Sequence, residues 1–146
     1  MIAPVFVDTN VLVHWRDPSS PEKHARAQGW LRHLWTTRRG RLSFQVLNEY
    51  YSVATTKLEP GVRPSDARID VRNLLAWQPQ AVDGDLLDEA WEVQDRFGFA
   101  FWDSLIVAAA RATASRYLLT EDLQHGQELD GVIVLSPFLA APADAA

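Results

Sequence analysis

The sequence predicts an α/β fold in which one domain is built on a parallel sheet. Short runs of apolar, often β-branched residues alternate along the chain with longer segments whose apolar residues recur at helical spacing. This alternation is typical of right-handed βαβ units, which form parallel sheets covered by helices. A chain of 146 residues is long enough for one hydrophobic core and too short for two ordinary domains.

The first half of the chain is expected to contain two strands and four helices. Strands are expected at residues 4–7 and 41–44, and helices at residues 11–15, 21–39, 45–58 and 65–78. The second of these helices has Ser20 as its N-cap and proline at its first position, and Gly40 ends it. Ser65 is the expected N-cap of the fourth, which ends before Pro79.

The second half continues the alternation with three short strands and two helices. Strands are expected at residues 80–82, 116–120 and 131–137, and helices at residues 83–98 and 99–114. The helix at 83–98 has an apolar stripe opposite an acidic, solvated face. Because the helix at 99–114 is mostly small and apolar, it is expected to lie against the sheet. We expect the domain to span residues 1–138, followed by a flexible tail at residues 139–146.

Composition excludes several classes of protein. With 47% hydrophobic and 23% charged residues, the chain resembles an ordinary soluble globular protein. Its longest apolar run, residues 105–110, is far shorter than the roughly 20 residues that a membrane-spanning helix needs. No cysteine is present, which excludes disulfides, thiol nucleophiles and cysteine zinc sites. No basic residue precedes the first apolar run, as a signal peptide would require, so a cytoplasmic protein is expected.

Charge is distributed unevenly along the chain. The net charge is −5, but residues 1–41 hold seven of the 14 basic side chains and only three of the 19 acidic ones. This asymmetry is compatible with a basic surface beside an acidic pocket, and Arg38, Arg39 and Arg41 are the candidates to contact phosphates. It is equally compatible with solvated helix faces.

Four carboxylates lie where the predicted elements converge. Asp8 and Asp122 follow apolar strands, at the edge where open α/β sheets place their ligands. Glu49 lies on the side of its helix opposite the apolar residues, and Asp103 lies in the first turn of another helix. A structural explanation is available for Asp103, since a helix dipole favours an acid there.

Carboxylates that are brought together repel one another and raise one another's pKa unless a cation compensates them. Oxygen ligands without His or Cys at metal-ligand spacing favour Mg²⁺ or Mn²⁺ over Zn²⁺. A divalent ion lowers the pKa of a bound water and neutralises a leaving oxygen, which suits phosphodiester hydrolysis.

Four segments in order carry a family resemblance. VDTNVLV at residues 7–13, LNEYY at 47–51, FWDSLIVAAA at 101–110 and LLTEDLQHG at 118–126 resemble the signature segments of PIN-domain ribonucleases, and among these the VapC toxins of bacterial toxin-antitoxin pairs. The resemblance spans residues 5–137. It places the family's acids on Asp8, Glu49, Asp103 and Asp122, its hydroxyl position on Thr120, and its polar partner on Asn10.

The resemblance implies a five-stranded parallel sheet flanked by helices and Mg²⁺-dependent cleavage of RNA. It also implies a homodimer, and an antitoxin that blocks the site. Three alternatives stay open: a solitary PIN-type nuclease that processes RNA, a haloacid dehalogenase-like phosphatase, and a catalytically silent binding module. The phosphatase pattern needs a second Asp two residues after the first, where this chain has Asn10. A catalytically silent module is expected to have lost at least one of the four acids, whereas all four are present.

Two further positions leave a choice open. Glu121 precedes Asp122, so two alternatives are open: the fourth ligand is Asp122 alone, or Glu121 shares or takes its place. We favour Asp122 because it matches the family position. Trp102 beside Asp103 suggests a platform for base stacking. We favour core or dimer contacts for the six tryptophans, however. The four histidines form no HxH or HExxH pair and are interpreted as structural.

Overall fold

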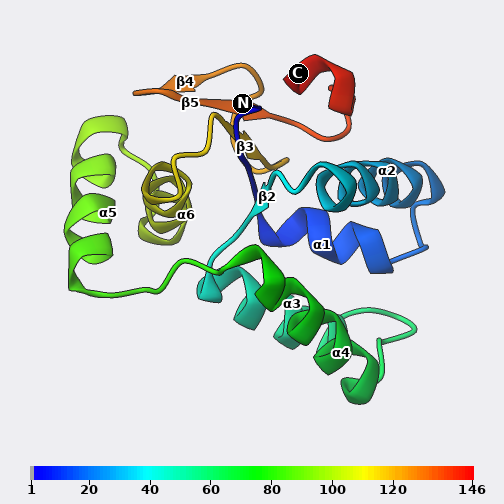
Figure 1. The fold of residues 1–146 in the computed structure, drawn as a ribbon. Helices are drawn as coiled ribbons and strands as arrows, with labels where there is room; N and C mark the ends of the chain where they lie inside the picture. The colour runs from blue at the N-terminus through cyan, green and yellow to red at the C-terminus, as the bar shows by residue number, and fades with distance from the viewer. Residues whose placement is uncertain (1) are drawn as a thin grey trace.

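The sheet of this chain has five strands in the order β2-β1-β3-β5-β4, in a computed structural model that describes residues 2–146 (Figure 1). The strands are β1 (Val5–Val7), β2 (Gly40–Arg41), β3 (Tyr117–Leu119), β4 (Glu128–Leu129) and β5 (Val132–Leu135). β2, β1, β3 and β5 run parallel, and β4 pairs antiparallel with β5. The predicted α/β class and five-stranded sheet are confirmed, with one antiparallel pair.

The fifth strand is not the one that the sequence predicted. In place of a strand at residues 80–82 there is a single parallel bridge between Gln80 and Ser43. The fifth strand, β4, belongs to a hairpin whose two loop residues, Asp130 and Gly131, have φ angles of 51° and 103°. An Asp-Gly pair with positive φ at both positions is a favoured hairpin turn. The hairpin was therefore recognisable in the sequence.

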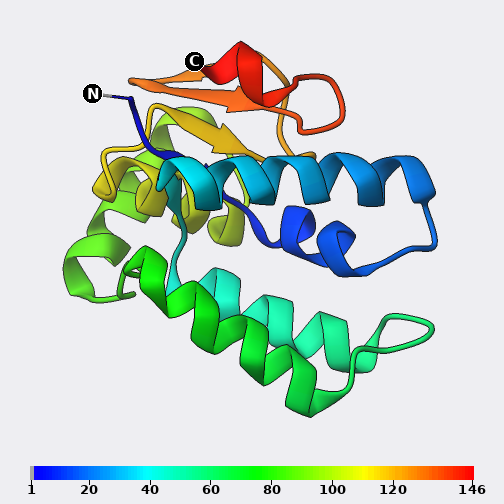
Figure 2. The ribbon, with the colours of Figure 1, turned by 45° about the vertical axis from the view of Figure 1, so that its right-hand side comes forward.

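Six α-helices and two short 3₁₀ helices surround the sheet. They are α1 (Thr9–Arg16), α2 (Pro21–Thr37), α3 (Phe44–Thr56), α4 (Pro64–Leu74), η1 (Leu75–Trp77), α5 (Gly84–Phe97), α6 (Phe101–Ala112) and η2 (Pro142–Ala145). Helices α5 and α6 lie on one side of the sheet and α1 and α2 on the other (Figure 1). The antiparallel pair α3 and α4 lies beyond α1, away from the hairpin of β4 and β5 (Figure 2).

Helix ends differ from prediction where proline or side-chain caps intervene. α4 begins at Pro64 and not after a Ser65 cap, because proline fits the first helical position, where its missing N–H is not needed. The same element ends at Leu74 and continues as η1 to Trp77. α1 begins at Thr9, earlier than predicted, with Asp8 as its N-cap.

Strand β1 and helix α6 lie in the centre of the core. All three residues of β1 are inaccessible to solvent, and residues 104–110 of α6 are buried, as their apolar composition predicted. Because β1 is flanked by strands on both sides and covered by helices, the residue that follows it is held in a fixed place. Among residues 2–146 no helix is both long enough and apolar enough to cross a membrane.

The last residues, expected to form a flexible tail, are packed against α2. The indole Nε1 of Trp30 donates to the Ala140 carbonyl at 3.0 Å, and Arg26 donates to the Phe138 carbonyl at 3.0 Å. Arg39 donates to the carbonyl of Ala145, whose side chain is buried. Backbone carbonyls, which composition does not reveal, make these contacts.

Gly40 is required for the close contact between β2 and η1. A Cβ atom at this position would lie 2.5 Å from ring atoms of the buried Trp77. We expect Gly40→Ala to reduce the free energy of unfolding by about 1–3 kcal/mol, the usual cost of overpacking. Urea denaturation measures this. Gly29→Ala is the matched control, because nothing lies within 4 Å of its Cβ position. Alanine in this helix should stabilise by about 0.5–1 kcal/mol, and equal effects of both substitutions would contradict the packing argument.

Candidate active site

The carboxyl ends of β1 and β3 bring together the first and last parts of the site. Val7 pairs with Leu119 in parallel register, so Asp8 and Thr120 leave the sheet side by side. The Asp8 backbone N–H donates to the Leu119 carbonyl at 3.1 Å, which extends the pairing by one residue. Asp8 and Asp122, more than a hundred residues apart in sequence, therefore reach the same edge of the sheet.

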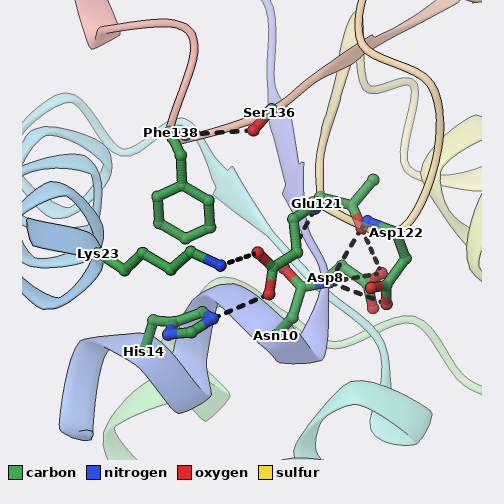
Figure 3. A network of polar contacts seen from close by, with 9 residues as sticks. Asp8, Asn10, His14, Lys23, Glu121, Asp122, Ser136 and Phe138 are labelled. Carbon is green, nitrogen blue, oxygen red and sulfur yellow. Dashed lines mark hydrogen bonds and ion pairs between the residues drawn. The ribbon is translucent and has the colours of Figure 1, made fainter. Parts of the chain in front are cut away.

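Neutral donors hold Asp8 and Asp122 in place. Asp8 Oδ1 accepts from the Thr9 backbone N–H at 2.7 Å, and its Oδ2 accepts from Thr120 Oγ1 at 2.8 Å. Asn10 Nδ2 lies 3.3 Å from Asp8 Oδ2 and 3.1 Å from Asp122 Oδ2 (Figure 3). Thr120 Oγ1 in turn accepts from Asn10 Nδ2 at 3.0 Å and from the Asp122 backbone N–H at 3.1 Å. Asn10 thus links both carboxylates, and Thr120 links the Asp8 carboxylate to the Asp122 backbone, without adding charge.

Glu49 reaches this group from α3. Its Oε2 accepts from Thr9 Oγ1 at 3.0 Å, which ties α3 to the start of α1, and its Oε1 accepts from Gln45 Nε2 at 3.0 Å, one helical turn earlier. Helix α3 takes this position because Ser43 caps it, accepting from the Val46 N–H, and because its apolar side is buried. Glu49 is left on the side that faces the sheet edge.

Asp103 completes the group from the first turn of α6. Burial raises the pKa of this carboxyl, and the nearby charges of Asp122 and Glu49 raise it further. Burial is also the main cause that raises the pKa of Asp8 from 3.8 to about 7. The charges of Asp122 and Glu49 add to this effect, while hydrogen bonds from Thr120 and Thr9 oppose it. Asp122 and Glu49 therefore lie within electrostatic range of both Asp8 and Asp103.

The donor set is chemically suited to a hard divalent cation. In the described part of the chain, residues 2–146, no group of three or more His, Asp or Glu side chains is arranged as it stands to hold a metal ion. Mg²⁺ does not require such a cage, because it keeps several waters and binds through one or two carboxylates plus substrate phosphates. Burial is the main cause of the raised pKa values of Asp8 and Asp103, and the charges of Asp122 and Glu49, which a cation would compensate, add to it. The residues present thus fit Mg²⁺ or Mn²⁺.

Glu121 points away from the group of acids. Its carboxylate binds His14 Nε2 at 2.8 Å and Lys23 Nζ at 2.9 Å, whereas Asp122 points toward Asp8 (Figure 3). Burial tends to raise the pKa of Glu121, but the bonds from Lys23 and His14 outweigh it and the net pKa is lowered. The choice of Asp122 over Glu121 is thus supported by geometry.

The three predicted RNA-binding arginines do not converge on the acids. Arg38 and Arg39 precede β2, at the amino edge of the sheet, opposite the edge of Asp8. Arg39 is only 4% exposed and donates to the backbone carbonyls of Ala3 and Ala145, so its guanidinium anchors the chain termini. Arg41 donates to the carbonyls of Arg38 and Gly40. The expectation for Arg39 is therefore corrected: burial leaves it no access to RNA.

Four residues near the acids were missed from sequence. Thr9 and Gln45 both donate to Glu49, and their positions gave a signal, since one follows Asp8 and the other lies four residues before Glu49 on the same helix face. His14 and Lys23 bind Glu121 across 107 and 98 residues, and no local pattern predicts such a contact.

A second polar network fixes α1 and α4 against α3. Asp70 is buried and accepts from Tyr50 Oη at 2.6 Å and from Arg16 Nη2 at 2.6 Å and Nε at 2.9 Å. Burial and the charge of Asp70 raise the pKa of Tyr50 above its usual range, so the phenol stays a neutral donor. Because Tyr50 directly follows Glu49, this network helps to fix the orientation of α3 and of its carboxylate.

The comparisons with known proteins identify the family. The fold and site are those of an α/β protein with a carboxylate cluster at the sheet edge, and the PIN domain family model matches residues 5–127. The chain belongs to the PIN domain family. This membership argues against the haloacid dehalogenase-like alternative. No curated protein sequence matches the chain.

Two solved structures share this fold. One is VapC20 of Mycobacterium tuberculosis, described as a toxin that cleaves the sarcin-ricin loop, with a TM-score of 0.60 and 23% identity over 78% of this chain and 86% of that chain. The other is a toxin-antitoxin complex from Klebsiella pneumoniae, with a TM-score of 0.59 and 15% identity over 91% of this chain and 97% of that chain. At these identities the similarity establishes the fold.

The raised pKa of Asp8 predicts a pH-dependent stability in the absence of metal. The folded protein binds a proton at Asp8 between pH 3.8 and about 7 that the unfolded chain does not bind, so this contribution to stability is lost as pH rises through that window. We expect the free energy of unfolding of Asp8→Asn to rise relative to that of wild type as pH increases through this window. The total change should be a few kcal/mol, since one pKa unit corresponds to about 1.4 kcal/mol. Urea denaturation in EDTA measures the difference. A difference independent of pH would contradict the assignment.

Added Mn²⁺ should stabilise wild type more above the raised pKa than below it.

The network of Tyr50 and Asp70 predicts a loss of stability on removing one hydroxyl. We expect Tyr50→Phe to lower the free energy of unfolding by about 1.5–3 kcal/mol, as for other hydrogen bonds to a charged group. The neighbouring Tyr51 is the matched control, because its hydroxyl accepts only from Arg68 at the surface. Tyr51→Phe should change stability by less than about 0.5 kcal/mol. Thermal or urea denaturation distinguishes the two, and equal effects would mean that the buried bond is not stabilising.

Proposed function

We propose that this protein is a metal-dependent endoribonuclease that hydrolyses RNA phosphodiester bonds. The observation that carries the proposal is the gathering of Asp8, Glu49, Asp103 and Asp122 at one sheet edge in a PIN domain, where burial and mutual repulsion raise the pKa of two of them. Such a cluster is suited to hold a cation against a phosphate. A catalytically silent module would not need all four acids, and all four are present.

The residues of the site fall into two groups, those that would bind the cation and those that orient them. When bound, Mg²⁺ or Mn²⁺ lowers the pKa of a water and neutralises negative charge on the phosphate and leaving oxygen. Asp8, Asp103 and Asp122 would hold the ion, and Glu49 would hold it or accept a proton from the attacking water. Thr120 and Asn10 orient Asp8 and Asp122 through the bonds described above. The expected products carry a 5'-phosphate and a 3'-hydroxyl.

The biological role that we propose is that of the toxin in a toxin-antitoxin pair, active in the cytoplasm. Support comes from the two structures that share the fold, one described as a toxin that cleaves the sarcin-ricin loop and the other as a toxin-antitoxin complex. A cognate antitoxin would then bind this chain, and a homodimer would let one antitoxin chain reach two sites. A solitary PIN-type nuclease is the alternative; a short open reading frame beside this one, encoding a basic or DNA-binding protein, would favour the toxin.

The acids provide the direct test. We expect Asp8→Asn and Asp103→Asn each to reduce cleavage of RNA by more than about 100-fold, because loss of outer-shell partners alone costs 10–100-fold at metal sites. Growth inhibition on induction should disappear with it. Asp95→Asn, on the exposed face of α5, is the matched control and should leave cleavage unchanged. Sequencing of RNA ends with purified protein, with and without EDTA, gives cut sites and end groups together.

Two outcomes would overturn the proposal. Cleavage that persists in both acid variants, in preparations free of contaminating nuclease, would remove these residues from the chemistry. Products ending in a 2',3'-cyclic phosphate would indicate attack by the ribose hydroxyl, and thus a different mechanism.

A further inference from the structure

A pocket of about 560 Å³ lies directly beside the acids, between the starts of α3 and α6. It is lined chiefly by Phe44, Gln45, Asn48, Glu49, Val82 and Trp102. The segment after η1 forms its third wall, because Phe44 N–H donates to the Gln80 carbonyl at 3.1 Å and holds that segment against the start of α3 (Figure 1). Its size falls within the roughly 300–1,000 Å³ of small-molecule sites.

The pocket is continuous with the proposed catalytic group. Glu49 belongs to both, and Trp102 immediately precedes Asp103 in the first turn of α6. The Trp102 carbonyl accepts from Gln45 Nε2 at 3.5 Å, the same amide nitrogen that donates to Glu49. A ligand in this pocket would therefore lie next to whatever occupies the carboxylate cluster.

The lining offers aromatic faces and a polar wall. Trp102 is 63% exposed and Phe44 is 42% exposed. Of the two interpretations of Trp102, core or dimer contact, exposure contradicts the first, and the second stays a prediction. Gln45 is 8% exposed, and its Oε1 is buried without a hydrogen-bond partner among residues 2–146. An unpaired acceptor of this kind costs free energy, which a donor brought by a ligand would recover after a small side-chain movement. Asn48 supplies a second amide.

Charge decides which part of a nucleotide fits. Glu49 lines the pocket and Asp103 adjoins it, so a phosphate would be repelled there. A neutral, planar base with donors on its edge matches the aromatic faces and the amide wall, since bases stack on aromatic side chains regardless of sequence.

We propose that this pocket binds a nucleobase of the substrate RNA, the base of a nucleotide next to the scissile phosphate, with Trp102 as the stacking surface. The inference rests on the proposed function and makes it more specific, because it places one base of single-stranded RNA beside the cleaved bond. Val82 and Phe44 close the sides of the pocket, and Gln45 and Asn48 read the edge of the base.

A protein surface is the competing occupant. A second hollow, between α3 and α4, adjoins the pocket through Phe44 and Asn48 and includes Leu47, Val71 and Leu75. That hollow also contains Arg68 and Arg72 and includes none of the four acids. The pocket at Trp102 differs from it by its two acidic neighbours and its unpaired amide oxygen, which favour a base.

The test measures RNA binding in an Asp8→Asn background, where no cleavage interferes. The probe is a fluorescently labelled single-stranded RNA of mixed sequence, and a second set carries one abasic nucleotide moved along the strand. Trp102→Ala is compared with Trp102→Phe and with Trp91→Ala, which removes another exposed tryptophan, 49% exposed on α5 and outside this pocket. Because Trp102 is largely exposed, the variants should fold, and circular dichroism checks this.

We expect Trp102→Ala to raise the Kd for intact RNA by about 5- to 150-fold, the range that corresponds to loss of one stacked base. Trp102→Phe should recover most of the affinity, and Trp91→Ala should bind like the parent. When the abasic nucleotide occupies the position that enters the pocket, the Kd of the Asp8→Asn parent should rise to the same extent. On that RNA, Trp102→Ala should cause no further loss of affinity.

Three results would overturn the inference: equal binding by Trp102→Ala and Trp91→Ala, an equal loss on intact and abasic RNA, or absence of RNA binding by the parent. A change in sedimentation mass on Trp102→Ala, with RNA binding unchanged, would assign the pocket to a protein contact instead.

Cleavage by the protein with Asp8 restored separates the two proposals. If RNA binding depends on Trp102 but no RNA is cleaved, only the proposed nuclease function is contradicted. If Trp102→Ala and Trp91→Ala cleave RNA equally well, only the proposed base pocket is contradicted.

Discussion

The parallel pairing of β1 with β3 is the constraint on which the site depends. It places Asp8 and Thr120 at adjacent strand ends, and the hydroxyl of Thr120 then binds both Asp8 and the backbone of Asp122. Because β1 is buried on both faces and paired on both edges, a shift of this register would break both ladders and draw the Asp8 carboxyl into the apolar core. The rest of the site is added to this pair by helices that pack on the same core.

Gathering carboxylates in one place is unfavourable, and the fold supplies only partial compensation. Donors to Asp8 and Glu49 are neutral hydroxyls and amides, and the nearby side chains of Lys23 and His14 are engaged by Glu121. The pKa of Asp8 is raised, mainly by burial and further by the charges of Asp122 and Glu49. In the function proposed above, a bound cation would compensate this charge, and the same charge would disfavour phosphate in the aromatic pocket next to it.

Much of the fold and most of the carboxylate cluster were predictable because they depend on local patterns. Apolar runs with helical or strand periodicity located nearly every element, and acids that follow such runs located Asp8 and Asp122. The strand expected at residues 80–82 failed because its backbone bonds are made to the start of α3, through Gln80 and Phe44, and not to a long ladder. The hairpin at Asp130 was overlooked although its turn residues favoured it.

By itself, then, the sequence determined the α/β class, and it predicted the four acids and a hard divalent ion, since oxygen ligands without Cys or paired His favour Mg²⁺ or Mn²⁺. Only the tertiary structure showed that Glu121 and Asp122, at adjacent positions, point in opposite directions, with Asp122 toward Asp8. It also buried Arg39 under the chain termini and left Trp102 exposed beside the acids. The physical reason is common to all three: the direction and burial of a side chain depend on partners distant in sequence, and local periodicity carries no information about them.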